Sequence, residues 1–328
     1  MASAISVADL ASGVRAGDRG VLARALTLVE SQRVDHRLQA QELLAELLCD
    51  TGQAQRMGIT GVPGVGKSTF LEAFGMHLVE SGRRVAVLAV DPSSSVTGGS
   101  ILGDKARMHE LAQHPAAFIR PSPSGATLGG VARRTRECLL LCEAAGFDTV
   151  LVETVGVGQS ETLVADMVDF FLVLALPGAG DELQGIKKGI LELADLVVVN
   201  KADGDNLARA NTAVRDMTAA MRYLRPRFEA WTPRVQAISA REGTGLDEVV
   251  AATLEHRALA ERHGHFVAQR QAQQGRWLWE EIDDELRAAF RAHPRVREQL
   301  SKIEAAVRGG DLPAGEGAHR LLDAFRQD

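Results

Sequence analysis

The sequence contains only three cysteines, Cys49, Cys138 and Cys142, among its 328 residues. They are too few for a disulfide framework and form no C-x-x-C pair, so we expect a protein of the reducing cytoplasm. Cys138 and Cys142 lie four residues apart on an expected helix. That spacing allows a pair of metal ligands, but burial as two small hydrophobic side chains is the stronger expectation.

The sequence also lacks an excess of positive charge, long apolar runs and clustered metal ligands. Its formal net charge of -6 offers no electrostatic footprint for nucleic acid. Glycines and charged residues interrupt every apolar run well before ~18 residues, so no membrane-spanning helix is expected. Residues 1–10 do not resemble a signal peptide. The nine histidines form no metal-binding cluster, and no Ser-His-Asp or Cys-His arrangement is apparent.

What the sequence does contain is a glycine-rich motif at residues 61–69. It follows the phosphate-binding pattern G-x-x-x-x-G-K-[ST], after a short apolar run and before a helical stretch. Such glycines let backbone N–H groups converge on phosphate oxygens at the start of a helix. Lys67 is predicted to reach the β- and γ-phosphates, and the Ser68 hydroxyl to bind Mg²⁺. The predicted phosphate-binding residues are Gly61, Val62, Pro63, Gly64, Val65, Gly66, Lys67, Ser68 and Thr69.

Hydrophobic periodicity divides the chain into three expected domains. Residues 1–52 carry apolar positions at helical spacing and are expected to form an N-terminal helical extension. Residues 53–260 alternate strands with helices around the phosphate-binding motif and are expected to form the nucleotide-binding domain. Residues 261–328 are expected to form a C-terminal helical arm that carries Trp277 and Trp279. Those tryptophans indicate either an interface or packing on the main domain, and the residues leave both open.

Seven strands are predicted in the middle of the chain. Several are near-continuous apolar runs, which is typical of parallel strands covered on both faces. The expected fold is therefore α/β, a mostly parallel sheet with helices on both faces and ligand-binding loops at the carboxyl ends of its strands. The predicted strands are residues 57–60, 85–90, 117–120, 150–153, 170–176, 196–200 and 235–239.

A second motif, from Asn200 and Lys201 to Asp203, indicates which base is bound. A carboxylate at Asp203 can accept two hydrogen bonds from guanine, whereas adenine would present a lone pair to it. GTP and GDP are therefore predicted ligands in preference to ATP. The segment Ser239, Ala240 and Arg241 follows the last predicted strand and is expected to close over the guanine through its backbone N–H groups.

Acidic residues after two other strands are candidates for the metal and the γ-phosphate. Glu153 ends one apolar strand and is expected to hold Mg²⁺ directly or through water, with the Gly156 N–H meeting the γ-phosphate. A carboxylate that caps the sheet edge is the alternative for Glu153. Asp91 directly follows another strand and is a candidate for contact with Mg²⁺ or the attacking water. Asp104, in a glycine-bearing loop, is a further candidate, with helix capping as its alternative.

Together these motifs resemble those of the methylmalonyl-CoA mutase-associated GTPases, the MeaB, ArgK and MMAA family. The resemblance covers essentially the whole chain, including both helical extensions. Its long segments at 91–108 and 153–161 are far more specific than a P-loop alone. The matching motifs, in chain order, are G-V-P-G-V-G-K-S-T, D-P-S-S-S, G-S-I-L-G-D-K-x-R-M, R-P-S-P-S-G-x-x-L-G-G, E-T-V-G-V-G-Q-S-E, N-K-A-D and S-A-R-E.

This resemblance implies a GTPase that acts as a chaperone of an adenosylcobalamin-dependent acyl-CoA mutase, with methylmalonyl-CoA mutase the first expectation. GTP would gate loading, protection or reactivation of the cobalamin cofactor. The resemblance also implies a homodimer held by the C-terminal helices and a third switch loop at 177–189 that contacts the mutase. By position it implies a phosphate and Mg²⁺ site made by Lys67, Ser68, Asp91, Asp104 and Glu153.

Two other functions compete with this interpretation. One is a GTPase that delivers a metal, which the absence of a Cys/His ligand cluster opposes. The other is an ATP-dependent kinase linked to amino-acid transport, which Asp203 opposes. No catalytic glutamine or arginine can be assigned, although Gln159 is the glutamine nearest to the second switch. We therefore expect slow intrinsic hydrolysis that a partner accelerates.

Overall fold

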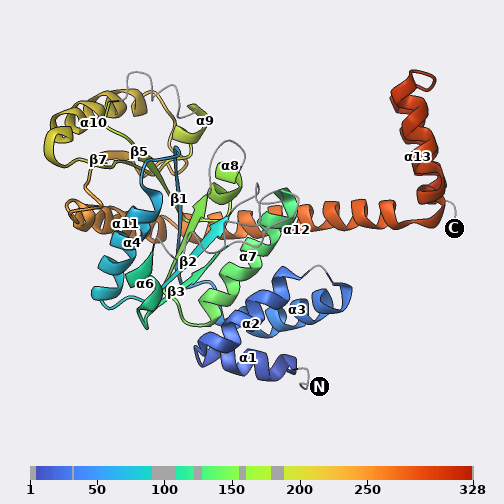
Figure 1. The fold of residues 1–328 in the computed structure, drawn as a ribbon, viewed down its shortest axis with the longest axis horizontal. Helices are drawn as coiled ribbons and strands as arrows, with labels where there is room; N and C mark the ends of the chain where they lie inside the picture. Colours follow the sequence, from blue (N-terminus) through green and yellow to red (C-terminus); the bar gives the residue numbers. More distant parts are fainter. Residues whose placement is uncertain are drawn as a thin grey trace. The chain divides into compact units, whose positions relative to one another are not determined.

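A seven-stranded, fully parallel sheet forms the core of the chain (Figure 1). The computed structural model describes residues 5–31, 33–90, 108–121, 128–154, 160–178 and 188–326. Within it, Met1–Gln273 and Gln274–Asp328 form two compact units, which we describe separately. The predicted α/β class is confirmed, and all seven predicted strands are present with ends that differ by at most two residues.

The strand order β3-β2-β4-β1-β5-β6-β7 places the glycine-rich motif at the end of a central strand. Most of these strands are buried along their whole length, which explains their near-continuous apolar sequences. Because every strand is parallel, all their carboxyl ends meet at one edge, where ligands bind in such folds. The strands are β1 (Gln55–Gly61), β2 (Val85–Val90), β3 (Ala117–Arg120), β4 (Thr149–Thr154), β5 (Phe170–Ala175), β6 (Leu196–Val199) and β7 (Arg234–Ala237).

Helices cover both faces of the sheet. Because successive side chains of β1 point to opposite faces, its residues pack alternately against the two layers of helices. On one face, Met57 and Ile59 share a hydrophobic core with residues of α4, α6 and α11. On the other face, Gly58 lies so close to Phe171 and to Val164 of α8 that an added Cβ would come within 2.7 Å and 2.9 Å of their side chains. The elements are α4 (Lys67–Glu80), α6 (His109–Gln113), α7 (Leu128–Ala144), α8 (Ser160–Ala165), α9 (Lys188–Leu191), η2 (Gly204–Asn206), α10 (Leu207–Met221) and α11 (Leu246–Arg262).

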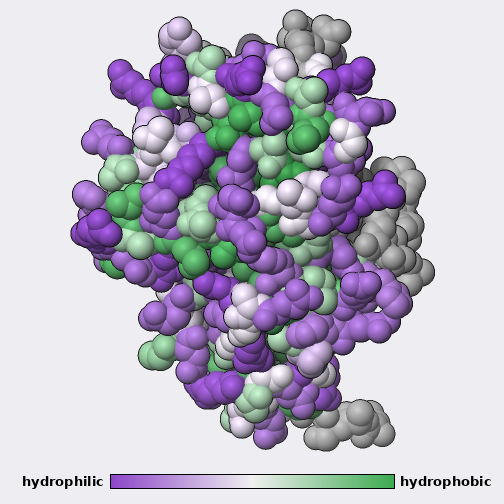
Figure 2. Space-filling model, turned by 90° about the vertical axis from the view of Figure 1, so that its left-hand side faces the viewer, coloured by the Kyte–Doolittle hydropathy of each residue, from purple (hydrophilic) through white to green (hydrophobic). Residues whose placement is uncertain are grey.

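The sheet edge beyond β6 and β7 is flanked by α10. On the face that carries α10 and α11, hydrophilic side chains surround the hydrophobic ones that reach the surface (Figure 2). This pattern is typical of helices that turn one side to the core and the other to water.

Within residues 5–31 and 33–50, the N-terminal helical extension consists of separate short helices. They are α1 (Val7–Arg15), α2 (Arg19–Glu30) and α3 (Val34–Leu47), followed by the short 3-10 helix η1 (Leu48–Asp50). Side-chain caps set the first two starts. The Ser6 hydroxyl accepts from the Asp9 N–H at 3.1 Å, and the Asp18 carboxylate accepts from the N–H groups of Gly20 and Val21. The apolar sides of these helices pack against one another and on α7.

On α7, Cys138 and Cys142 are both buried, as expected of small hydrophobic side chains, and their burial raises the pKa of each thiol. Cys49 is exposed. Across the described ranges, no group of three or more His, Cys, Asp or Glu residues could hold a metal ion.

The second unit contains the later turns of α12 (His265–Ala292), with α13 (Pro294–Gly309) and α14 (Ala314–Arg326). Pro294 occupies the first turn of α13, and Gly310 ends it with a left-handed φ of 82°. The Phe290 and Phe325 rings meet edge to face, with centroids 5.4 Å apart, and fasten α14 to the end of α12. None of the helices in the described part of the chain is long and apolar enough to cross a membrane.

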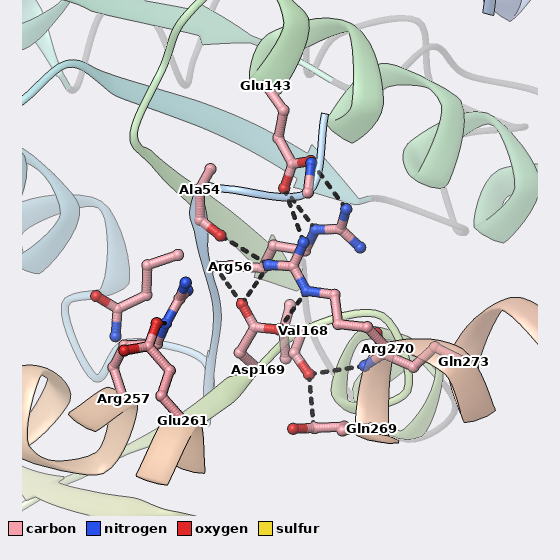
Figure 3. A network of polar contacts seen from close by, with 12 residues as sticks. Ala54, Arg56, Glu143, Val168, Asp169, Arg257, Glu261, Gln269, Arg270 and Gln273 are labelled. Atoms are coloured by element: carbon pink, nitrogen blue, oxygen red, sulfur yellow. Dashed lines mark hydrogen bonds and ion pairs between the residues drawn. The ribbon is translucent and has the colours of Figure 1, made fainter. Parts of the chain in front are cut away.

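Two arginines and two carboxylates form a buried network at the sheet edge opposite the glycine-rich loop (Figure 3). Arg270 of α12 donates to both Asp169 oxygens at 2.8 Å and 2.7 Å, and to the Ala54 carbonyl at 2.7 Å. Arg56 donates to both oxygens of Glu143, at 2.7 Å and 3.0 Å. Arg270 also reaches Glu143 at 3.3 Å, so the two ion pairs are joined. The network fastens the root of α12 to β1, α7 and the residue that precedes β5.

Arg270→Met is expected to lower the free energy of unfolding by about 3–5 kcal/mol, because it leaves the buried Asp169 carboxylate without the guanidinium that neutralises it. Chemical denaturation of the nucleotide-free protein measures this change. Arg262→Met is the matched control, since Arg262 is exposed at the end of α11, and it should change stability by only about 0.5 kcal/mol. Equal losses in the two variants would contradict the role given to the network.

Candidate nucleotide-binding site

The glycine-rich loop runs from the end of β1 to the start of α4. At two positions, Gly61 and Gly66, the neighbouring atoms leave no room for a side chain. A Cβ on Gly61 would lie 2.6 Å from the Leu174 carbonyl oxygen of β5. Gly66 has a φ of 95°, and a Cβ there would lie 2.9 Å from the Asn200 amide nitrogen. The loop can therefore follow this path only with glycine at these positions, and its N–H groups lead into the first turn of α4.

The Lys67 ammonium lies inside this loop. It donates to the carbonyl oxygens of Gly61 at 2.8 Å and Val62 at 3.4 Å. Partial burial lowers the pKa of Lys67, and the charges of Glu153 and Glu161 oppose that shift. The ammonium is thus held at the mouth of a helix N-terminus, where a phosphate oxygen would find both a cation and backbone donors.

Asn200 links the loop to the segment after β7. Its side-chain nitrogen donates to the Val65 carbonyl at 2.9 Å, and its side-chain oxygen accepts from the Ala240 N–H at 3.1 Å. Asn200 is 2% exposed, so both bonds are shielded from water. Lys201 adds a third link, because its ammonium donates to the Gly64 carbonyl at 2.8 Å. Hydrogen bonds therefore connect the segments that follow β1, β6 and β7 into one site.

Lys201 is also the single described non-glycine residue with a positive φ, at 61°. Such a left-handed conformation costs roughly 1–2 kcal/mol for a residue with a Cβ. Hydrogen bonds from Asn200 and from Lys201 itself to the glycine-rich loop offset this strain. Strain held in this way is typical of functional sites.

Asp203 is oriented by the segment that follows β7. The Ser239 hydroxyl donates to one Asp203 carboxylate oxygen at 2.6 Å and accepts from the Glu242 N–H at 3.1 Å. Beside this carboxylate lies a cavity of about 270 Å³, just below the range of roughly 300–1,000 Å³ common for small-ligand sites. Its lining residues are Gly66, Thr69, Asn200, Lys201, Asp203, Asn206, Ala240 and Arg241.

The cavity is lined by most of the residues that the sequence predicts to contact the guanine base. Asn206 lines it as well, and sequence reasoning missed this residue. Asn206 lies in η2, three positions after Asp203, where no motif marks it. Its place in the short turn directly after the motif is the one signal that could have suggested it.

The predicted metal and γ-phosphate residues are described only in part. Ser68 lies in the first turn of α4, and Glu153 is 4% exposed near the end of β4. In the β1 and β4 pairing, Glu153 is level with Ile59, two residues before Gly61. Asp91, Asp104 and Gly156 lie outside the described residues, as do Gln159 and most of the segments 91–108, 153–161 and 177–189.

Asn200→Ala should lower the free energy of unfolding by about 2–4 kcal/mol, because it leaves the Val65 carbonyl and the Ala240 N–H buried and unsatisfied. The loop and the base cavity would also lose their link, so nucleotide affinity should fall in parallel. Denaturation midpoints and GDP titration measure the two effects. Asn211→Ala, on the exposed side of α10, is the control and should change neither. Unchanged GDP binding by Asn200→Ala would refute the linking role.

The chain is similar to several known GTPases. A family model described as the methylmalonyl-CoA mutase-associated GTPase MeaB matches residues 22–295. A Caulobacter vibrioides protein described as a GTPase is 56% identical over 325 residues, which cover 99% of each chain. The mouse mitochondrial methylmalonic aciduria type A homolog is 47% identical over 97% of this chain and 79% of its own length. The Escherichia coli GTPase ArgK is 46% identical over 98% of each chain.

Among solved structures, this chain is similar to one described as a LAO/AO transport system kinase. The two share 40% sequence identity, and the alignment covers 99% of this chain and all of the other, with a TM-score of 0.78. Because the match spans nearly the whole length, it includes the helical segments that precede and follow the sheet domain in the sequence.

Proposed function

Because the chain belongs to the family of methylmalonyl-CoA mutase-associated GTPases, we propose that it is a GTP-driven chaperone of an adenosylcobalamin-dependent acyl-CoA mutase. As a member of this P-loop family, the chain binds GTP and GDP and is a GTP hydrolase. The mutase, its cobalamin and a cytoplasmic setting are the proposed part. In this role GTP gates loading, protection or reactivation of the client's cofactor, and methylmalonyl-CoA mutase is the first client to test.

The proposal is carried by a nucleotide site in which Lys67, Asn200 and Asp203 are each held by hydrogen bonds. This site lies in a chain that the model of the mutase-associated family matches over residues 22–295. Lys67 offers a cation to the phosphates, and Asp203 offers a fixed carboxylate to a guanine edge. The name of the mouse relative, which refers to methylmalonic aciduria, supports the same client.

Ser68 and Glu153 suit a Mg²⁺ ion that accompanies the nucleotide, and Asp91 and Asp104 are proposed to complete its surroundings. A hydroxyl and a carboxylate are the hard oxygen donors that Mg²⁺ prefers. Two observations support Glu153 in this role: it is buried near the carboxyl end of β4, and its charge opposes the lowering of the Lys67 pKa by burial. Bound there, Mg²⁺ would supply charge neutralisation for the phosphates.

The chain's own residues bind and position the nucleotide in this mechanism. Lys67 and the N–H groups of the glycine-rich loop hold the phosphates, while Asp203 and Asn200 fix the base side. Gly156 is proposed to meet the γ-phosphate. A GTPase without an assigned catalytic glutamine or arginine should hydrolyse GTP slowly alone and faster when a partner completes the site. The chain then binds and releases the mutase according to whether GTP or GDP occupies the site.

Binding of purified methylmalonyl-CoA mutase tests the client directly. The chain should bind the mutase with an affinity that differs about tenfold between a non-hydrolysable GTP analogue and GDP, a typical size for coupling between two sites. Asp203→Ala should lose this nucleotide dependence. Isobutyryl-CoA mutase serves as the second client, and the same affinity in both nucleotide states for both mutases would contradict the proposal.

The same family setting leads us to propose that the chain forms a homodimer through Gln274–Asp328. Large apolar side chains are exposed there, with Leu278 61%, Trp279 67% and Leu286 57% exposed. Exposed aromatic and aliphatic residues at such density are typical of an interface.

Leu286→Asp should shift the native mass from a dimer to the 35.1 kDa monomer, because it places a charge in the apolar surface. Light scattering coupled to size exclusion measures the mass. Gln299→Glu adds the same charge to an exposed position of α13 and should keep the dimer. A monomeric wild-type chain at micromolar concentration would contradict this proposal.

Two rival functions make different predictions. A kinase linked to amino-acid transport, suggested by the name of the similar solved structure, requires ATP in preference to GTP. A metal-delivering GTPase requires stoichiometric binding of a metal other than Mg²⁺. Nucleotide titration separates the first rival from our proposal, and metal analysis after equilibrium dialysis separates the second.

A further inference from the structure

A second cavity lies at the same carboxyl edge of the sheet, at the β2 and β3 end. It holds about 20 Å³ of free space and shares no lining residue with the base cavity. Helices α2 and α7 form its other walls. The sheet order separates the two cavities, because β2 and β3 are at one end of the sheet and β6 and β7 are at the other. Apolar walls come from residues such as Leu88 and Val131.

One of the two arginines in this cavity already has a partner. Arg120 donates through Nε to a Glu30 carboxylate oxygen at 3.0 Å, and its Nη2 contacts the other oxygen. The same Nη2 donates to the Thr27 hydroxyl at 3.1 Å. The Cys138 thiol also lies 3.8 Å from the first Glu30 oxygen. Both oxygens of Glu30 are therefore engaged within the chain.

Arg134 is the second arginine, and it is 8% exposed. Its Nε atom is buried and has no hydrogen-bond partner. Burial lowers the pKa of Arg134, and the charge of Arg133 adds to this effect against the opposing charges of Glu30 and Glu137. The cavity lining thus contains two guanidinium groups and one carboxylate, which leaves a buried positive charge with an unused donor. A buried charge of this kind is costly unless an anion meets it.

We propose that this cavity is an oxoanion site, in which Arg134 binds the carboxylate or phosphate group of a small ligand. Guanidinium groups suit both kinds of oxoanion because their N–H donors form a planar fork. The free space fits one small group, so the site takes the anionic end of a ligand while the rest extends outward. The GTPase would then sense a small acid separately from its nucleotide, and this inference is independent of which mutase is the client.

The test uses the full-length, GDP-loaded protein and measures its melting temperature at constant ionic strength. Sodium chloride is exchanged for sodium acetate in one series and for inorganic phosphate in another. We expect a saturable rise for the wild type in at least one series, and the anion that acts identifies the carboxylate or the phosphate class. Because phosphate can also bind the glycine-rich loop, the wild type must be compared with variants.

Arg134→Met should lose this rise, and in chloride alone it should melt at the wild-type temperature or above, because it removes an uncompensated buried charge. Arg134→Lys keeps the charge without the fork and should bind the anion about tenfold more weakly or worse. Arg24→Met, at an exposed position of α2, should respond as the wild type does. Two results would overturn the proposal: a lower melting temperature of Arg134→Met in chloride, or anion responses that are absent or equal in wild type and Arg134→Met.

Discussion

Asp203→Ala is expected to remove most of the preference for guanine over adenine nucleotides. The Ser239 hydroxyl fixes the carboxylate beside the base cavity, so Asp203 presents acceptors that the N–H groups of guanine match and those of adenine do not. Loss of two hydrogen bonds to a charged group should weaken GDP binding at least about 100-fold. ADP binding should change little, because the wild-type site already leaves its carboxylate unmatched.

Titration of GDP and ADP into both proteins measures this preference. Asp205→Ala removes an exposed carboxylate two residues away and should bind GDP as the wild type does. If ADP bound the wild type as tightly as GDP, the guanine assignment would fail and the kinase alternative would gain support.

Lys67→Met is expected to lower the rate of GTP hydrolysis by about 100- to 1,000-fold or more. The ammonium lies inside the glycine-rich loop, bonded to the Gly61 and Val62 carbonyls, where it would neutralise charge that develops on the phosphates. Methionine keeps much of the side-chain volume but removes the charge. Steady-state phosphate release, measured with GTP in excess, gives the rate.

Two checks separate this loss of catalysis from a loss of fold. The melting temperature of nucleotide-free Lys67→Met should stay close to that of the wild type, because burial already disfavours the ammonium. Lys302→Met, which removes an exposed ammonium on α13, should keep full activity. Hydrolysis at the wild-type rate by Lys67→Met would refute its assigned role.

The sheet was predictable because its strands are short, buried on both faces and therefore apolar without interruption, as in β5 (Phe170–Ala175) and β6 (Leu196–Val199). The glycine-rich loop was predictable because close backbone approach, as at Gly61, leaves no room for another residue. The strand order and the link from Asn200 to Val65 were not, since each depends on how distant segments meet. The motif marks Asn200 but does not say what its amide contacts.

Buried charges were the largest omission from the sequence interpretation. Arg56, Glu143, Asp169 and Arg270 are far apart in the chain, and each is an ordinary charged residue by itself. Their pairing appears only once β1, α7 and α12 meet. Arg134 is similar, because helical spacing on α7 does not reveal that its guanidinium would line a cavity whose acid is already paired with Arg120.

The central claim is that GTP turnover by this chain is timed by an acyl-CoA mutase. The most direct test measures the rate of GTP hydrolysis with and without a stoichiometric amount of purified methylmalonyl-CoA mutase, with Lys67→Met as the inactive control. We predict slow hydrolysis alone and at least about tenfold faster hydrolysis with the mutase, since a partner that completes such a site can add far more. Equal rates with and without the mutase would contradict the account.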